Sequence, residues 1–192
     1  MAYTLNKVLA DHSHKWLIAL RIVLIIVLVW WMSVIFRFSA QNGTQSTQAS
    51  DQVVEVFSDV IAKVTGNDHI KIKLTVTYRS QFEYGIRKLA HMFIYFILAI
   101  TAMLLLFTFE RVPMLVRMLL SVFGCFLYAC TDEFHQSFSY GRGPSLRDVF
   151  IDTFGASMGI IVALILFCII YTIYHSYQAY KIKRYNASIS EA

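Results

Sequence analysis

The sequence predicts an all-α membrane protein: a bundle of four transmembrane helices with an amphipathic helix in the long loop between the first two. Of its 192 residues, 57% are hydrophobic and only 15% are charged, whereas soluble domains carry about 25% charged residues. Four apolar stretches each approach or exceed the roughly 20 residues that cross the hydrocarbon of a bilayer. Eight glycines and two prolines are too few for a fibrous protein, and the chain is too apolar to be disordered. The composition therefore favours a polytopic membrane protein over a soluble one.

The first predicted span covers residues 16–36 and contains Arg21 as its only charged residue. It is longer than the apolar region of a secretory signal, which has about 7–15 residues, so we expect it to be retained. The other three spans are predicted at residues 89–109, 112–131 and 149–174. No internal repeat separates them, and we expect a single domain over residues 1–192.

Four spans place both termini on the same side of the membrane. The Lys and Arg residues divide almost equally between the two sides, but most of those opposite the termini lie in the long loop 37–87. Because long loops count less in the positive-inside rule, we expect the tails 1–15 and 175–192 in the cytoplasm. The loop 37–87 is then extracytoplasmic, and Arg21 and Arg117 are expected to extend toward the cytoplasmic surface. The predicted location is the cell membrane.

An amphipathic helix is predicted within the long loop. Its apolar residues recur at helical spacing: Val53, Val56, Phe57, Val60, Ile61 and Val64. Ser50 or Asp51 would begin this helix, and Gly66-Asn67 would end it. The helix would lie on the outer leaflet or cover the bundle, either as a docked lid without chemistry or with an active role.

Ionisable residues gather in three segments that the predicted topology places at the outer face. Such residues are costly next to a membrane span, so each needs a partner or a function. The start of the second span supplies Arg87, Lys88, His91 and Tyr95, of which Arg87, His91 and Tyr95 share one helical face. The end of the third span supplies Asp132, Glu133, His135 and Gln136, and the start of the fourth supplies Arg142, Arg147, Asp148 and Asp152.

A stripe of acidic and small residues runs along the fourth span: Asp148, Asp152, Gly155 and Gly159. Gly155 and Gly159 allow another helix to approach closely, so both carboxylates should point into the bundle, where they repel each other unless cations lie between them. The basic residues named above balance the acidic ones without a cofactor. The alternative is a divalent metal held by mixed N/O ligands, namely Asp132, His135, Asp148 and Asp152.

Structural explanations remain open for several of these residues. Ser145 and Asp148 have the spacing of a capping box, so Asp148 would only close the start of a helix. Lys88 would be an interfacial anchor, and His91 would form a hydrogen bond between helices.

Four sequence blocks resemble the VanZ-like family of bacterial integral membrane proteins, which is named after an accessory protein of teicoplanin resistance. The blocks are the stretch from Ile35 to Gly43, the stretch from Arg87 to Tyr95, Asp132-Glu-Phe-His-Gln136, and Gly141-Arg142 followed by Asp148-x-x-x-Asp152-x-x-Gly155. They occur in order over residues 34–159. The resemblance implies a bacterial membrane protein that acts near the outer leaflet and wall precursors, but it implies no reaction. One position departs from the family pattern, since Ile94 stands where we expect an acidic residue.

The leading functional hypothesis is binding of an anionic component of the cell envelope, a lipid phosphate or a wall precursor, with a contribution to glycopeptide (teicoplanin-type) resistance. The expected binding residues are Arg87, Lys88, Tyr95, Gln136, Arg142, Arg147, Asp148 and Asp152. Arginine suits bidentate contacts with phosphate. The basic residues flank apolar blocks, so no nucleic-acid partner is expected.

Two alternative functions remain open. In the first, a membrane hydrolase or transferase uses His135 as general acid and base, together with Asp132, Glu133 and His91, on a phospho- or ester-linked substrate. In the second, the charged residues only assemble the bundle, and function resides in partner contacts, including those of a homo-oligomer.

Overall fold

The structure is a computed structural model that describes residues 2–40, 43–67, 69, 72–138 and 143–190. Within these ranges the chain forms helices and no strand, which confirms the predicted all-α class. The helices are α1 (Ala2–Ser39), α2 (Gly43–Thr65), the short π-helix η1 (Lys73–Thr77), α4 (Arg79–Phe107), α5 (Met114–Gln136) and α6 (Leu146–Ser190).

Four helices are long and apolar enough to cross a membrane, as the sequence predicts. The candidate spans are Lys15–Ser39, Arg79–Phe107, Met114–Gln136 and Leu146–Arg184. Their bounds differ from the apolar windows because a helix continues wherever its backbone hydrogen bonds form, in hydrocarbon or in water. The second span shows this best: its helix begins at Arg79, where an Arg79–Glu83 ion pair one turn apart supports the polar first turns.

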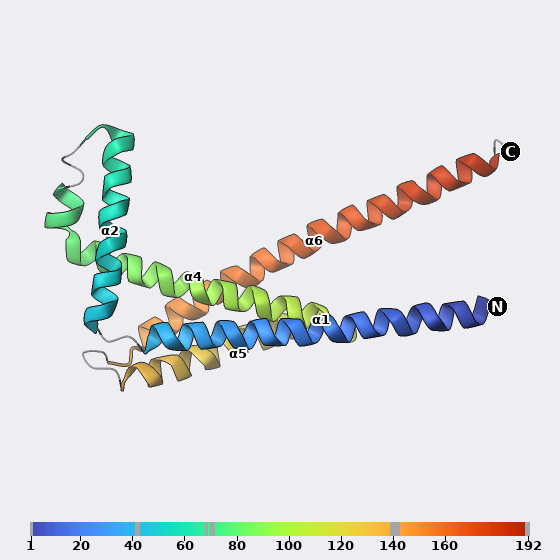
Figure 1. Ribbon diagram of the computed structural model, residues 1–192, viewed down its shortest axis with the longest axis horizontal. Coiled ribbons are helices and arrows are strands. Elements are labelled where there is room, and N and C mark those ends of the chain that lie inside the picture. Colours follow the sequence, from blue (N-terminus) through green and yellow to red (C-terminus); the bar gives the residue numbers. More distant parts are fainter. Residues whose placement is uncertain (1, 41–42, 68, 70–71, 139–142, 191–192) are drawn as a thin grey trace.

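Figure 1 shows α1, α4, α5 and α6 running along the long axis of the molecule, while α2 crosses one end. The N-terminal end of α1 and the C-terminal end of α6 both lie at the opposite end (Figure 1). This arrangement agrees with an even number of spans. With 45 residues, α6 is about 67 Å long at about 1.5 Å per residue, so it extends well beyond one hydrocarbon thickness.

The backbone of α6 approaches that of α4 closely at two glycines. A Cβ atom added to Gly155 would lie 2.2 Å from the backbone oxygen of Met92, and one added to Gly159 would lie 2.3 Å from that of Phe96. The two backbones therefore touch along one turn of each helix. This contact confirms that the small-residue stripe of the fourth span faces another helix.

Two arginines bind the turn between α4 and α5. Arg21 donates hydrogen bonds to Oγ1 and the backbone oxygen of Thr108, at 3.2 and 2.6 Å, and Arg117 donates one to the backbone oxygen of Phe109 at 2.8 Å. The sequence predicts that both side chains extend toward a membrane surface. In the structure both side chains instead donate to backbone oxygens at the end of α4, where the carbonyls lack partners within the helix.

The amphipathic helix of the loop is α2. It begins at Gly43, earlier than the predicted start at Ser50 or Asp51. The prediction missed the first turns because their residues are polar and show no apolar periodicity. It ends as predicted: Gly66 follows it with a φ of +64°, a left-handed conformation that glycine adopts without steric cost.

One side of α2 is docked on the start of α4. Val54, Ser58 and Ala62, which recur at a spacing of four, are buried. Asp51 forms an ion pair with Arg79 at 2.9 Å. Hydrogen bonds with the side chains of Glu83 and Arg79 lower the pKa of the Asp51 carboxyl. At neutral pH Asp51 is therefore ionised, and it holds α2 against the cationic end of α4.

A second face of α2 is apolar and exposed: Val53, Val56, Phe57, Val60 and Val64. These residues recur at helical spacing on a face next to the docked one, and the ring of Phe57 also contacts that of Phe82 of α4. Because α2 crosses the direction of the four long helices (Figure 1), a helix lying on the outer leaflet, as the sequence predicts, would bury this stripe in the surface of the bilayer.

We therefore expect a spin label at position 60 to lie in lipid. In a chain whose three cysteines are replaced by alanine, the label at Val60→Cys should collide frequently with oxygen and rarely with a water-soluble nickel chelate. A label at Glu55→Cys, on the polar side of the helix, is the matched control and should show the reverse. Equal nickel accessibility at the two positions would contradict the interfacial orientation.

Candidate functional site

Three of the predicted site residues meet inside the bundle, each from a different helix. His91 comes from α4, Asp132 from α5 and Asp152 from α6, and one potential ligand atom of each lies within 4.8 Å of the others. Nδ1 of His91 is 3.8 Å from Oδ1 of Asp152. Together with Tyr95, one turn after His91 on α4, these residues form what we call the polar cluster.

The contact between α4 and α6 positions this cluster. Gly155 lies against the backbone of Met92, the residue that follows His91. Asp152 precedes Gly155 by almost one helical turn, so the close approach brings its carboxylate beside His91. The glycines are thus the local reason that an acidic residue on α6 meets a histidine on α4.

The cluster is buried. Tyr95, Asp132 and Asp152 are 0%, 2% and 1% exposed, and Asp132 accepts a hydrogen bond from Nε2 of Gln136 at 3.2 Å. Within the described residues, no hydrogen bond reaches either carboxylate oxygen of Asp152 or the hydroxyl of Tyr95. That hydroxyl nevertheless interacts electrostatically with both carboxylates of the cluster. Buried polar groups of this kind are costly without partners.

An ion pair lies beside the cluster. Lys88 of α4 pairs with Asp148 of α6, and both side chains are about one-fifth exposed. The electrostatic interaction of Lys88 also reaches Asp152 and Glu133. The position of Asp148 is therefore explained by a contact between helices, and Lys88 joins α4 to α6 rather than only anchoring the membrane interface.

Glu133 connects α5 to the start of α6. Its Oε2 accepts a hydrogen bond from the backbone N–H of Ser145 at 2.8 Å, and its side chain is buried. Ser145 directly precedes α6, so this bond satisfies one backbone donor at a helix start. No periodicity in the sequence predicts such a bond between residues twelve positions apart.

The remaining predicted residues lie elsewhere. The ring of His135 contacts that of Phe36 of α1, with centroids 4.0 Å apart. Arg87 is half-buried and Arg147 is exposed, while Arg142 lies outside the described residues. Of the metal ligands expected from the sequence, the described part of the chain brings only Asp132 and Asp152 together, and His91 joins them. His135 and Asp148 make the other contacts given above.

Comparison with known protein families identifies the family of this chain. A family model described as VanZ/LLP1 matches residues 24–179. The chain belongs to the VanZ/LLP1 family. No curated protein and no solved structure matches it. Membership confirms the resemblance of the four sequence blocks, and the matched range of this VanZ/LLP1 protein contains the whole polar cluster.

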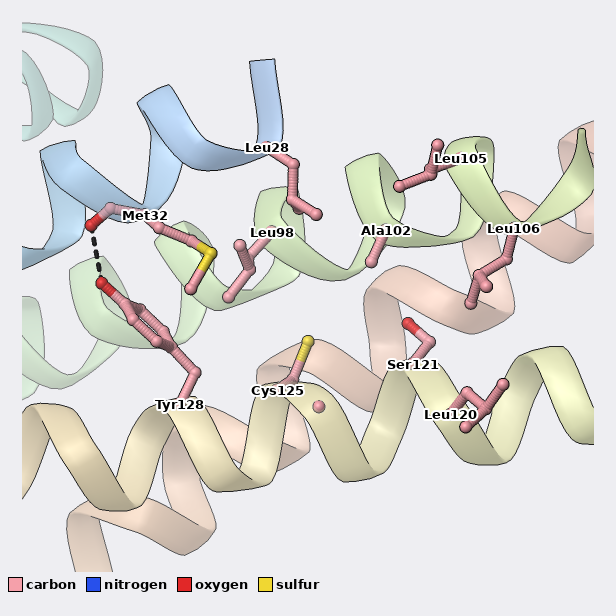
Figure 2. A pocket seen from close by; sticks show the side chains of 11 residues that line it. Leu28, Met32, Leu98, Ala102, Leu105, Leu106, Leu120, Ser121, Cys125 and Tyr128 are labelled. Carbon is pink, nitrogen blue, oxygen red and sulfur yellow. Dashed lines mark hydrogen bonds between the residues drawn. The ribbon is translucent and has the colours of Figure 1, made fainter. Parts of the chain in front are cut away.

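An apolar groove of about 280 Å³ lies between α1, α4 and α5 (Figure 2). Its lining residues are Leu28, Met32, Leu98, Ala102, Leu105, Leu106, Leu120, Ser121, Gly124, Cys125 and Tyr128. Figure 2 shows the hydroxyl of Tyr128 donating a hydrogen bond to the backbone oxygen of Met32, at 2.6 Å. The Tyr128 ring is also 6.1 Å from that of Tyr95.

Sequence reasoning missed this groove and the part that Tyr128 plays in it. The signal was present, because Tyr128 precedes Asp132 by four residues and so shares its face of α5. The cluster of this VanZ/LLP1 protein offers an imidazole beside a carboxylate, a second carboxylate and a phenol that can donate a hydrogen bond. Such a set can bind a metal ion, move a proton or donate to an anionic oxygen.

Proposed function

We propose that this VanZ/LLP1 protein binds a phosphate-bearing lipid of the bacterial cell envelope. Its headgroup lies at the polar cluster and its hydrocarbon chain lies in the apolar groove. The observation that carries the proposal is the place of Tyr128, which lines the groove and packs beside Tyr95 of the cluster. One side chain thus joins a polar site to an apolar one, as the recognition of an amphiphile requires.

The polar end supports a phosphate ligand. The Tyr95 hydroxyl is a buried donor without a hydrogen-bond acceptor in the described part of the chain, and Lys88 supplies positive charge to the same region. Arg147, in the first turn of α6, is exposed and available to an anion. A phosphate oxygen would accept hydrogen bonds from the phenol of Tyr95 and the guanidinium of Arg147, and the ion pair of Lys88 with Asp148 would limit the negative charge that it meets.

The apolar end supports a hydrocarbon chain. The groove is bounded by three candidate membrane spans. Nine of its eleven lining residues carry no charge and no side-chain amide or hydroxyl, and the other two are Ser121 and Tyr128. In a bilayer such a groove is filled by the lipid that surrounds it. Because Tyr128 of the groove packs beside Tyr95 of the cluster, the arrangement favours a lipid whose headgroup reaches that cluster.

The cellular role is carried over from the family resemblance. We propose that the cluster lies at the outer face of the cell membrane, with both termini cytoplasmic. Binding of an envelope lipid or lipid-linked wall precursor there would be this protein's contribution to teicoplanin resistance.

Filling the groove tests the proposal. An added Cβ at Gly124 meets nothing within 4 Å, so Gly124→Leu should fold while its side chain occupies the groove. We expect the phospholipid that co-purifies with the protein, measured by mass spectrometry, to fall at least about five-fold. Leu127→Phe, on a half-exposed position of α5, is the control and should retain it.

A cellular assay should give the same ranking: a bacterium expressing Leu127→Phe should match wild type in teicoplanin susceptibility, and one expressing Gly124→Leu should be more susceptible. Unchanged lipid retention in Gly124→Leu would overturn the proposal.

A second candidate is a membrane hydrolase or transferase that acts on the same lipid. The contact of His91 with Asp152, at 3.8 Å, favours it, because a carboxylate beside an imidazole orients a general base. The contacts of His135 support that role less well, since its ring packs on Phe36. Release of phosphate or headgroup from a bound lipid, abolished in His91→Gln while lipid retention persists, would establish turnover over binding alone.

A further inference from the structure

We infer that His91, Asp132 and Asp152 hold a divalent metal ion, and that this ion binds the phosphate of the lipid. Only the second part, binding of the lipid phosphate by the ion, rests on the proposed function. The first part, a metal site made by α4, α5 and α6, stands on the geometry of the three side chains.

The spacing of the ligand atoms suits one shared ion. All three lie within 4.8 Å of one another. Atoms that coordinate the same ion at about 2.1 Å lie at most about 4.2 Å apart, so small side-chain rotations close the set. Because each ligand belongs to a different helix, the ion would also hold the three helices together.

One ligand and one neighbouring side chain are buried without the hydrogen bonds that a bound group would supply. Both carboxylate oxygens of Asp152 and the hydroxyl of Tyr95 lack a hydrogen bond within the described residues, and both residues are at most 1% exposed. The Tyr95 hydroxyl interacts electrostatically with the two carboxylates, and Tyr95 follows His91 by one turn on the same face of α4. A 2+ ion would balance the two carboxylates in this low-dielectric setting.

The donor set restricts the identity of the metal. One imidazole nitrogen with two carboxylates suits Zn²⁺ or Mn²⁺ better than Ca²⁺ or Mg²⁺, which prefer oxygen ligands alone. Gln136 supports the site from outside, because its Nε2 donates to Oδ2 of Asp132 at 3.2 Å and thereby orients that carboxylate.

A bound ion would also explain how an anion approaches this cluster. Two buried carboxylates repel a phosphate, and Lys88 is already paired with Asp148. An ion held by three protein ligands keeps open coordination positions, and a phosphate oxygen can occupy one of them. The metal would thus turn an acidic site into a phosphate-binding one.

Metal titration of the full chain in lipid nanodiscs tests the inference. The protein, purified with a tag free of histidine and stripped with a chelator, is titrated with Mn²⁺ alone, and bound metal is counted by elemental analysis. We expect about one Mn²⁺ per chain, with affinity at least about ten-fold lower in Asp152→Asn and in His91→Gln. His135→Gln, a histidine outside the cluster, is the matched control and should bind as wild type does.

A spectroscopic readout covers the case in which a variant fails to fold. The electron spin-echo spectrum of Mn²⁺ bound to wild type should show coupling to an imidazole nitrogen that is lost in folded His91→Gln and kept in His135→Gln. Absence of bound Mn²⁺ in wild type, or bound Mn²⁺ without this coupling, would overturn the metal site. Retention of phospholipid by metal-free protein would then leave the proposed function standing, whereas metal binding without phospholipid would refute that function alone.

Discussion

Replacing Gly155 with valine is expected to separate α4 from α6 and to remove the polar cluster. The first atom of the new side chain would lie 2.2 Å from the backbone oxygen of Met92, and a backbone atom cannot move aside as a flexible side chain does. Overpacking in a well-packed interior costs about 1–3 kcal/mol, and a clash between two helix backbones should lie at the upper end. Folded protein after detergent extraction should fall at least about five-fold, as measured by the monodisperse fraction in gel filtration.

The control for this prediction is a glycine in open space. Gly124→Val adds the same side chain to α5, where a Cβ meets nothing within 4 Å, and its yield should match that of wild type. Gly159→Val, one turn after Gly155 and 2.3 Å from the backbone oxygen of Phe96, should behave as Gly155→Val does. Normal yields for both helix-contact variants would contradict the packing of α6 on α4.

Replacing Lys88 with glutamate is expected to reduce binding of the lipid phosphate at least about ten-fold. The substitution leaves Asp148 without its partner and adds a fourth acidic side chain to a region where Asp148 already interacts with Asp152 and Glu133. Loss of a partly buried, charge-assisted hydrogen bond costs about 1.5–3 kcal/mol. Binding is measured by titrating purified protein with a fluorescent phospholipid in detergent.

A variant with the two charges exchanged distinguishes loss of the ion pair from loss of the lysine itself. Lys88→Asp combined with Asp148→Lys restores an ion pair between the same two helices and should recover most of the binding. Lys183→Glu makes the same charge reversal at an exposed position near the end of α6 and should have no effect. A swapped pair that binds no better than Lys88→Glu would show that Lys88 acts on the ligand itself rather than through Asp148.

Local spacing in the sequence predicted much of the candidate site. His91 and Tyr95 are four residues apart, as are Asp148 and Asp152, so each pair shares a face of its helix whatever the neighbours are. The two glycines after Asp152 indicated which face of α6 meets another helix. These are properties of a single helix, and the structure keeps them.

Contacts between helices were not predictable in the same way. The choice of His91 rather than His135 as the neighbour of Asp152 depends on how α5 is rotated against α4 and α6. His135 lies only three residues after Asp132, yet its ring faces Phe36 of α1. A shift of one residue turns a helical side chain by about 100°, and no pattern within one helix fixes that rotation.

The helix bounds show the same limit. The apolar windows located the hydrocarbon crossings but not the extra turns at Arg79, because those turns are polar and are held by contacts with Asp51 and Glu83. The start of α2 at Gly43 was missed for a similar reason, since hydropathy detects burial in hydrocarbon rather than the helix itself.

By itself, the sequence determined that this protein is a four-span, all-α member of the VanZ/LLP1 family, because hydrophobic length and short motifs are properties of consecutive residues. Only the tertiary structure decided that His91, Asp132 and Asp152 converge and that an apolar groove forms between α1, α4 and α5. The physical reason is that both features arise where three helices pack together, and packing depends on the rotation and close approach of residues far apart in the chain.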